Sequence, residues 1–587
     1  MKMRHQNPHS NRHKIPLLGF LCLMCICFLS AENRSYLHPY PSGFRKAVWQ
    51  DTVKSVSAET TVRPNRPANP KSGNKTRIDL LFAENAKSDQ LSLPDVEVLV
   101  GNVRLRHDSM YMFCDSALIF KVKNSVEAFG NVHMEQGDTL FIDGDYLYYD
   151  GTTQMAQLRE NVKLINKTTE LTTDSLNYDR VMDLGYYFDG GVLVDSDNVL
   201  TSEWGEYSPS TKIAVFNHDV KLVNPKFTLS SDTLKYNTET KIATILGPSL
   251  IDSEDDHIYS ERGSYNTQTG IAYFLNRSIL ANEGRRIIAD SIYFNRAEEY
   301  GEAFDNVIMT DTVNMNMMMG DYCYYNDREG TAMGTKNAVA VDYSQGDSLF
   351  VHGDSLWLHT YDIHTDSVWR VIQAYHHVRA YRTDVQAVSD SMVYISKDSC
   401  LTMYAEPVIW YGNQQILGEE IKVFFNDSTI ERAQVINQAL AIDRFDTLHY
   451  NQISGREMTA FFQDGEVYRV DVNGNVMVIY YPIDDKDSTI IGLDYSEGSF
   501  LRMKVRERKM ERGAFIGKAN GVMYPLEQVP ADRKHLPSFV WLDYIRPKDK
   551  NDIFVWREKK AGEHLQKSDR KPVASPRNMN IKRNSKK

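Results

Sequence analysis

The chain has 587 residues and a formal net charge of -11. A chain of this length normally divides into several domains, unless it is built from repeats whose core grows in one dimension. The acidic balance argues against a general nucleic-acid-binding protein.

The N-terminal 31 residues have the pattern of an export signal. Basic residues as far as Lys14 precede an apolar run from Ile15 to Leu29, and Ser30-Ala31 leads into a polar stretch. We expect cleavage near Ala31, with a retained membrane anchor as the alternative. Residues 32–77 are rich in Ser, Thr, Pro and Asn, a composition that predicts a disordered linker.

Residues 78–481 repeat a phrase of the form Asp-Ser-apolar-x-aromatic. The five consecutive steps from Asp145 to Asp290 are 29 residues each, and about twelve repeats are present. A fixed period of this size is typical of solenoids and stacked arrays. The anchors of the phrase are Asp115, Asp145, Asp174, Glu203, Asp232, Glu261, Asp290, Asp321, Asp354, Asp390, Glu419 and, degenerately, Arg456.

Each repeat predicts two β-strands joined by turns. The second and fourth residues after an anchor are mostly apolar while the third is free to be polar, which indicates a half-buried strand. A second phrase, Gly or Asn followed by apolar-x-apolar, comes 14 to 17 residues after many anchors. We expect the anchor acid and its Ser to cap backbone groups at a strand entrance, as scaffold. Gly205 and Gly263 replace an inward apolar residue and predict a bulge or a bend.

The C-terminal part follows the repeats less closely. Residues 482–546 predict an extension of the β-array or a cap. Residues 547–587 are basic and predict a disordered tail, which either is simply solvated or makes a weak contact with anionic lipid or a partner.

Motifs for chemistry are missing from the sequence. It has no phosphate-binding loop, nucleophile elbow or dinucleotide fingerprint. The histidines between His352 and His377 lack a metal-binding spacing, so we expect no metal, no cofactor and no enzymatic activity. Beyond the signal only Cys114, Cys323 and Cys400 remain, which implies no disulfide framework, and Cys323 is expected to be buried.

Several phrases resemble the OstA-like family, the type of LptA and the N-terminal domain of LptD. They are Val100-Gly101-Asn102-Val103-Arg104-Leu105, Phe129-Gly130-Asn131-Val132 and Ala289-Asp290-Ser291-Ile292-Tyr293-Phe294. The resemblance implies an all-β fold, an elongated, twisted β-jellyroll or solenoid. It also implies an apolar interior that carries the acyl chains of lipopolysaccharide.

By this resemblance the inward apolar residues are candidates for a lipid groove. If the strand layers meet tightly they form a closed core, and if the layers splay they form a groove. The candidates are Val132, Met134, Leu147, Tyr149, Val162, Leu164, Leu176, Tyr178, Val220, Leu222, Leu234, Tyr236, Ile292 and Phe294.

The leading hypothesis is an exported bridge in the periplasm, possibly associated with the outer membrane. It would pass lipopolysaccharide or a related lipid to other bridge or outer-membrane proteins, with no nucleic-acid partner and with peripheral membrane contact. One alternative is a structural or partner-binding β-solenoid with a closed core. Another is a carbohydrate-active β-solenoid enzyme, but no outward stripe of acids and aromatics supports it.

Overall fold

The computed structural model describes residues 76–565, apart from 89–94, 255, 283, 314, 345–346, 364, 366, 427–428, 464–465, 485–488 and 507–508. These residues form 37 β-strands, with antiparallel pairing, and five short 3₁₀ helices. The predicted all-β class is confirmed. The expected signal peptide, linker residues 32–75 and tail residues 566–587 lie outside the described residues. The described residues form two compact units that divide at Gly301.

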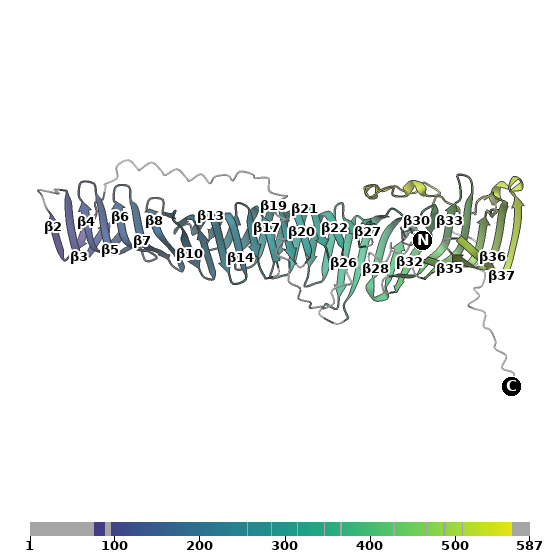
Figure 1. Ribbon diagram of the computed structural model, residues 1–587, viewed down its shortest axis with the longest axis horizontal. Helices are drawn as coiled ribbons and strands as arrows, with labels where there is room; N and C mark the ends of the chain where they lie inside the picture. Colours follow the sequence, from purple (N-terminus) through teal and green to yellow (C-terminus); the bar gives the residue numbers. More distant parts are fainter. Residues whose placement is uncertain are drawn as a thin grey trace, which may run out of the picture. The chain divides into compact units, whose positions relative to one another are not determined.

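The first unit contains strands that follow one another along the chain (Figure 1). They are β1 (Asp79–Phe82), β2 (Asn85–Ser88), β3 (Val96–His107), β4 (Met110–Phe120), β5 (Ser125–Gln136), β6 (Leu140–Asp150), β7 (Met155–Asn166), β8 (Thr169–Asp179), β9 (Leu184–Tyr187), β10 (Gly191–Asp195), β11 (Asn198–Ser202), β12 (Trp204–Ser208), β13 (Ile213–Asn224), β14 (Phe227–Asn237), β15 (Ile242–Ile245), β16 (Ser249–Asp252), β17 (Asp256–Ser260), β18 (Arg262–Asn266), β19 (Ile271–Asn282) and β20 (Arg285–Asn295).

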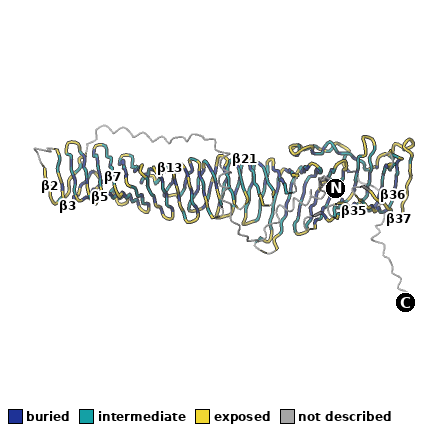
Figure 2. The backbone as a smooth tube through the Cα atoms, viewed as in Figure 1, coloured by how far each residue is buried: buried dark blue, intermediate teal, exposed yellow. Residues whose placement is uncertain are grey.

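The strands of the first unit build two hydrogen-bonded ladders. Residues 213–217 of β13 pair with β12, whereas residues 221–223 pair with β11. Long strands therefore contribute one half to each ladder, and short strands belong to one ladder only. In each repeat, ladder A contains the strand halves that follow the anchor acid, together with the short strands β9, β12, β15 and β18. Ladder B contains the strand halves that precede the anchor acid, together with the short strands β10, β11, β16 and β17. Buried and exposed residues alternate along both (Figure 2).

A corner joins the two ladders where each long strand bends. In β7 both Glu160 and Asn161 have left-handed backbones, with φ of 62° and 50°, a conformation that Gly and Asn tolerate best. The Asn161 side-chain amide donates to Asp145 Oδ2 at 2.6 Å. The anchor acid thus lies in the middle of β6 and holds a neighbouring corner. The expected position at a strand entrance was wrong, because the strand bends at the anchor and continues.

The two glycines at inward positions do not mark bulges. Pairing of β12 with β13 is uninterrupted through Gly205, and pairing of β18 with β19 is uninterrupted through Gly263. A Cβ at Gly205 would lie 2.5 Å from Tyr187 Oη, so this glycine makes room for the tyrosine ring. A Cβ at Gly263 would lie 2.4 Å from the carbonyl oxygen of Tyr273. Both glycines therefore serve close packing, and the predicted bulge is corrected.

The second unit is also built from antiparallel strands, and its boundary at residue 302 falls within its first strand. Its elements are β21 (Tyr300–Asp311), β22 (Asn316–Asn326), β23 (Thr331–Thr335), β24 (Val339–Asp342), β25 (Leu349–His352), β26 (Ser355–Tyr361), β27 (Trp369–Tyr381), β28 (Val385–Ile395), η1 (Ser396–Asp398), β29 (Cys400–Tyr404), β30 (Val408–Tyr411), β31 (Gln414–Leu417), β32 (Glu420–Asn426), β33 (Thr429–Arg444), β34 (Tyr450–Gln463), β35 (Glu466–Tyr480), β36 (Gly492–Arg506), β37 (Lys509–Pro525), η2 (Leu526–Gln528), η3 (Ala531–Arg533), η4 (Asp543–Ile545) and η5 (Asp552–Phe554). In the segment predicted as an extension or a cap, β36 and β37 extend the pairing from β35.

Residues 529–565, here called the strap, lie on the outer face of the second unit (Figure 1, yellow-green). Leu542 and Ile545 of the strap belong to the same buried cluster as Trp410 and Leu440. Ile553 is completely buried beside Val339 and Val341. Residues 547–565 therefore differ from the disordered tail predicted for 547–587. Apolar residues scattered among charges anchor this segment to strands far away in the sequence.

Two buried glutamines bind the main chain of the strap. Gln415 donates from Nε2 to the carbonyl oxygen of Val540 at 2.8 Å and accepts from the Leu542 amide at 2.7 Å. Gln452 makes the same pair of bonds, to Lys534 and from Leu536. Each side chain satisfies an amide and a carbonyl that the irregular strap leaves unpaired, which buried backbone requires.

Replacing Gln415 with Leu should loosen the strap, because the variant leaves the Val540 carbonyl and the Leu542 amide buried without partners. We expect a loss of local stability of about 2–4 kcal/mol, since each unsatisfied buried group costs roughly 1–3 kcal/mol. Hydrogen exchange of residues 536–545 measures the change. The matched control is Gln414→Leu, whose exposed side chain lies next in sequence. Equal exchange in both variants would show that the amide clip is not what holds the strap.

Candidate functional site

The interior of the first unit, between ladders A and B, is the candidate site. Thirteen of the fourteen sequence-predicted residues point into it and are at most 4% exposed; Phe294 is half-buried. Those of ladder B are Val132, Met134, Val162, Leu164, Val220 and Leu222; those of ladder A are Leu147, Tyr149, Leu176, Tyr178, Leu234, Tyr236, Ile292 and Phe294.

Side chains from the two ladders pack directly against one another. A Cβ at Gly185 of ladder A would lie 3.5 Å from Leu164 Cδ1 of ladder B. Burial is less complete in β19 and β20, where inward Leu280 and Ile287 are half-buried along with Phe294. The interior is thus a continuous apolar layer, tightly packed over most of its length and looser at these two strands.

A further row of inward residues was missed by the sequence reasoning. Each lies three residues before an anchor and belongs to ladder B, opposite the residues that follow the anchors. The signal was present, because these apolar side chains recur at the same 29-residue step: Ile142, Leu171, Leu200, Leu229 and Ile258, all at most 8% exposed.

Hydrogen bonds from side chains close the edge of the interior opposite the corners, here called the mouth. His107 Nδ1 lies 2.7 Å from Tyr149 Oη. The Asn166 amide donates at 3.1 Å to Tyr207 Oη and to the carbonyl oxygen of Pro209. Each pair joins the end of a ladder B strand to the end of a ladder A strand. The tyrosines of this mouth recur every 29 residues, as Tyr149, Tyr178, Tyr207, Tyr236 and Tyr265, and Phe294 then takes their place without a hydroxyl.

A buried ion pair also spans the mouth. Lys241 Nζ lies 2.7 and 2.8 Å from the two carboxylate oxygens of Asp195, which is wholly inaccessible to solvent. Tyr236 Oη donates to the same carboxylate at 2.8 Å, and Asn198 donates to Tyr236 Oη at 2.9 Å. The carboxylate is therefore compensated by a cation and a hydroxyl, as burial of a charge requires.

Tyr149, Tyr178 and Tyr236 of the mouth remain protonated over the whole neutral range. Burial raises the pKa of Tyr149, Tyr178 and Tyr236 above the ordinary value for tyrosine. Burial also raises the pKa of Tyr187 to about 12, and its hydroxyl lies 2.7 Å from Ser202 Oγ. These hydroxyls can therefore act as hydrogen-bond donors at neutral pH, which the contact with Asp195 requires.

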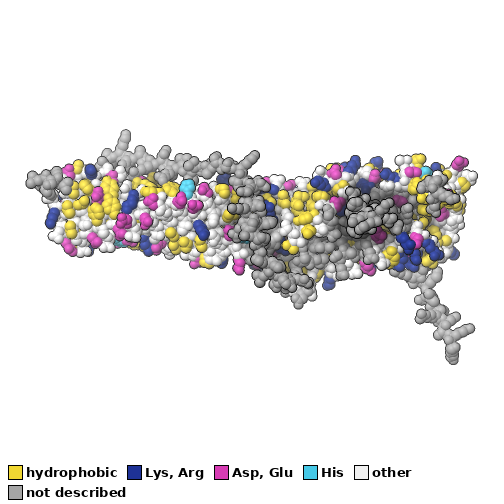
Figure 3. All heavy atoms as spheres, in the orientation of Figure 1, with side chains coloured by type: hydrophobic (Ala, Val, Ile, Leu, Met, Phe, Trp, Pro, Cys, Tyr) yellow, Lys and Arg dark blue, Asp and Glu magenta, His cyan; other side chains and the backbone are white. Residues whose placement is uncertain are grey.

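The outer surface of the first unit differs from its interior. Acidic and basic side chains are dispersed over the face shown in Figure 3. Within the part of the chain that the structure describes, no group of three His, Cys, Asp or Glu side chains could hold a metal ion. No helix among the described residues is long and apolar enough to cross a membrane.

Cys323 of the second unit is buried as expected, and burial raises the pKa of its thiol to about 12.

A comparison with known protein families matches part of the first unit. The family model described as OstA-like protein matches residues 75–232, which run from the start of the described residues into β14. No curated protein matches the chain. The matched segment contains both ladders, the corners and the mouth tyrosines from Tyr149 to Tyr207. Residues 75–232 are therefore similar to the OstA-like family, in agreement with the family that the repeated phrases resemble.

Proposed function

We propose that this chain is a non-enzymatic lipid carrier. Lipopolysaccharide, or a related lipid with acyl chains, would move along the interior between ladders A and B. The compartment would be the periplasm, where the chain would bridge to other transport or outer-membrane proteins. The match of residues 75–232 to the OstA-like family supports this proposal, because the resemblance to that family implies a β-jellyroll that carries acyl chains.

One observation carries the proposal: the continuous apolar interior is closed at the mouth by side-chain contacts. Such contacts can separate without breaking a strand ladder. A typical hydrogen bond stabilises a fold by only about 0.5–1.5 kcal/mol net, while burying one methylene contributes about 0.8 kcal/mol. Burial of a long acyl chain can therefore compensate for the free energy lost when several mouth hydrogen bonds break. Contacts between the acyl chain and the inward side chains replace the contacts that these side chains made with each other. The apolar layer shields the chain from water, and a partner supplies the energy for transport.

Lipid co-purification tests the proposal. The full chain is purified from its native host, extracted with organic solvent and analysed for lipid by mass spectrometry. Leu222→Asn places a polar group in the interior, whereas Lys221→Asn changes an exposed neighbour on the same strand. We expect bound lipid in the wild type and in Lys221→Asn, with a several-fold reduction in a folded Leu222→Asn variant.

The closed-core alternative makes the opposite prediction. The tight packing around Leu164 and Tyr178 is the observation that favours it. If the interior is only a core, the wild-type chain carries no stoichiometric lipid and polar inward substitutions simply unfold it. That combination of results would rule out lipid carriage.

A further inference from the structure

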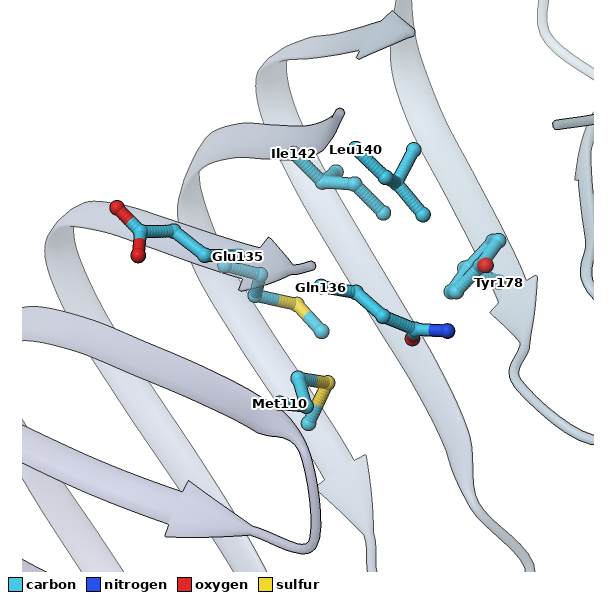
Figure 4. A pocket seen from close by; sticks show the side chains of 7 residues that line it. Met110, Glu135, Gln136, Leu140, Ile142 and Tyr178 are labelled. Carbon is cyan, nitrogen blue, oxygen red and sulfur yellow. The ribbon is translucent and has the colours of Figure 1, made fainter. Parts of the chain in front are cut away.

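A small apolar crevice opens into the interior at the mouth, between β4, β5 and β6 on one side and β8 on the other (Figure 4). The empty space in it, open solvent included, is about 160 Å³, and its lining is mainly apolar. Tyr178 comes from ladder A and the remaining residues from ladder B. The lining consists of Met110, Met134, Glu135, Gln136, Leu140, Ile142 and Tyr178.

The guanidinium of Arg180 lies at the rim of this crevice. Its Nε donates to Gln136 Oε1, a lining atom, at 3.3 Å. Its Nη1 donates to Tyr149 Oη at 2.8 Å and lies 3.3 Å from His107 Nδ1. Both His107 and Tyr149 are completely buried, and His107 Nε2 also contacts the Thr76 carbonyl oxygen at 3.1 Å. Two buried side chains thus hold the cation at the mouth.

No carboxylate lies within ion-pairing distance of Arg180 among the described residues. Four of the acids nearby have other partners. Asp150 accepts from the Thr152 and Thr153 amides, and Asp179 accepts from the Val181 and Met182 amides. Asp183 accepts from Tyr178 Oη and from the Ser210 amide, and Glu135 pairs with His133. Arg180 therefore makes no direct ion pair with the described residues.

The corresponding part of the mouth three repeats later has a buried carboxylate as counter-ion. There the cation Lys241 pairs with Asp195, and the buried carboxylate also accepts from Tyr236. Tyr149 corresponds to Tyr236, and His107 stands where Asp195 would be, at the end of a ladder B strand. At Tyr149 the mouth therefore has a cation, Arg180, but a histidine, His107, stands in the position of the buried carboxylate.

We propose that Arg180 and the crevice form a binding site for an anionic amphiphile with a phosphate head group. The guanidinium binds phosphate oxygens through its free N–H groups, which suit that geometry. The alkyl chain enters between Met110 and Tyr178 and displaces the side chains that line the crevice. This proposal rests on the proposed lipid-carrying function and assigns to it a head-group site.

Binding of decyl phosphate to the full chain tests the site, with decyl maltoside as the uncharged amphiphile and inorganic phosphate as the head group alone. Arg180→Gln should weaken decyl phosphate binding about tenfold or more and leave decyl maltoside binding unchanged. Arg180→Lys should retain part of the affinity. The matched control is Arg159→Gln, because Arg159 also has only neutral acceptors but lies on the outer side of β7.

Two outcomes would overturn the site. The first is equal decyl phosphate affinity in wild type and Arg180→Gln, each shown by circular dichroism to be folded. The second is inorganic phosphate binding as tightly as decyl phosphate, which would indicate a free-phosphate site. Either result leaves lipid carriage standing if lipid still co-purifies with the wild type. Absence of both co-purified lipid and decyl phosphate binding contradicts the proposed function itself.

Discussion

Replacing Lys241 with methionine is expected to cost the first unit about 3–5 kcal/mol of local stability, the usual range when one partner of a buried ion pair is removed. The Asp195 carboxylate is wholly buried and would keep only the Tyr236 hydroxyl as a partner. Hydrogen exchange of β10 and β14 measures the opening free energy, because it reports local rather than global unfolding. Amides of these strands should exchange several hundred-fold faster or more.

Two further variants show whether the lost ion pair is the cause. In Asp195→Asn/Lys241→Met neither charge remains, so the double variant should be less destabilised than Lys241→Met alone. Arg106→Met breaks an ion pair with Asp79 in which the two side chains are 44% and 56% exposed, so solvent screens the pair and its loss should have little effect on stability. A double variant as unstable as the single one would contradict the account of the mouth.

Substitution of Leu542 with aspartate is expected to release the strap from the second unit. Leu542 is completely buried in the cluster around Trp410, so the variant must either bury an unpaired charge or expose the apolar outer face. The cost is several kcal/mol, and the strap between residues 529 and 565 should become a site of rapid proteolysis. Limited proteolysis followed by mass spectrometry locates the cuts.

The control for strap release lies within the strap itself. Val555 is 49% exposed, so Val555→Asp should leave the cleavage pattern unchanged. If Leu542→Asp and the wild type are cut at the same rate, the strap is not held by its apolar contacts. If both aspartate variants release it, the strap is only weakly attached throughout.

Local pattern was enough to predict the repeat and its inward face. Leu147 and Tyr149 follow Asp145 with the period of a strand, and the structure buries both. Ile142 repeats at the same step but precedes the anchor. Because the anchor was interpreted as a strand entrance, the residues before it were not assigned to a strand, and half of ladder B was missed.

Long-range contacts could not be predicted in the same way. His107 meets Tyr149, and Asp195 meets Tyr236, only because the corner folds one ladder over the other. The strap is a second case: Ile553 lies in a charged stretch, and its partners Val339 and Val341 are more than 200 residues away in the sequence. No periodicity in residues 547–565 signals that contact.

Site-specific photocrosslinking in cells tests lipid carriage most directly. A crosslinking residue is placed at Leu234, which is fully buried in the interior, or at Lys235, which is exposed on the opposite face of β14. Lipid carriage predicts adducts with lipid from position 234 and none from position 235. Absence of lipid adducts from position 234 and from the neighbouring inward positions 176 and 222, in chains that remain folded, would contradict it.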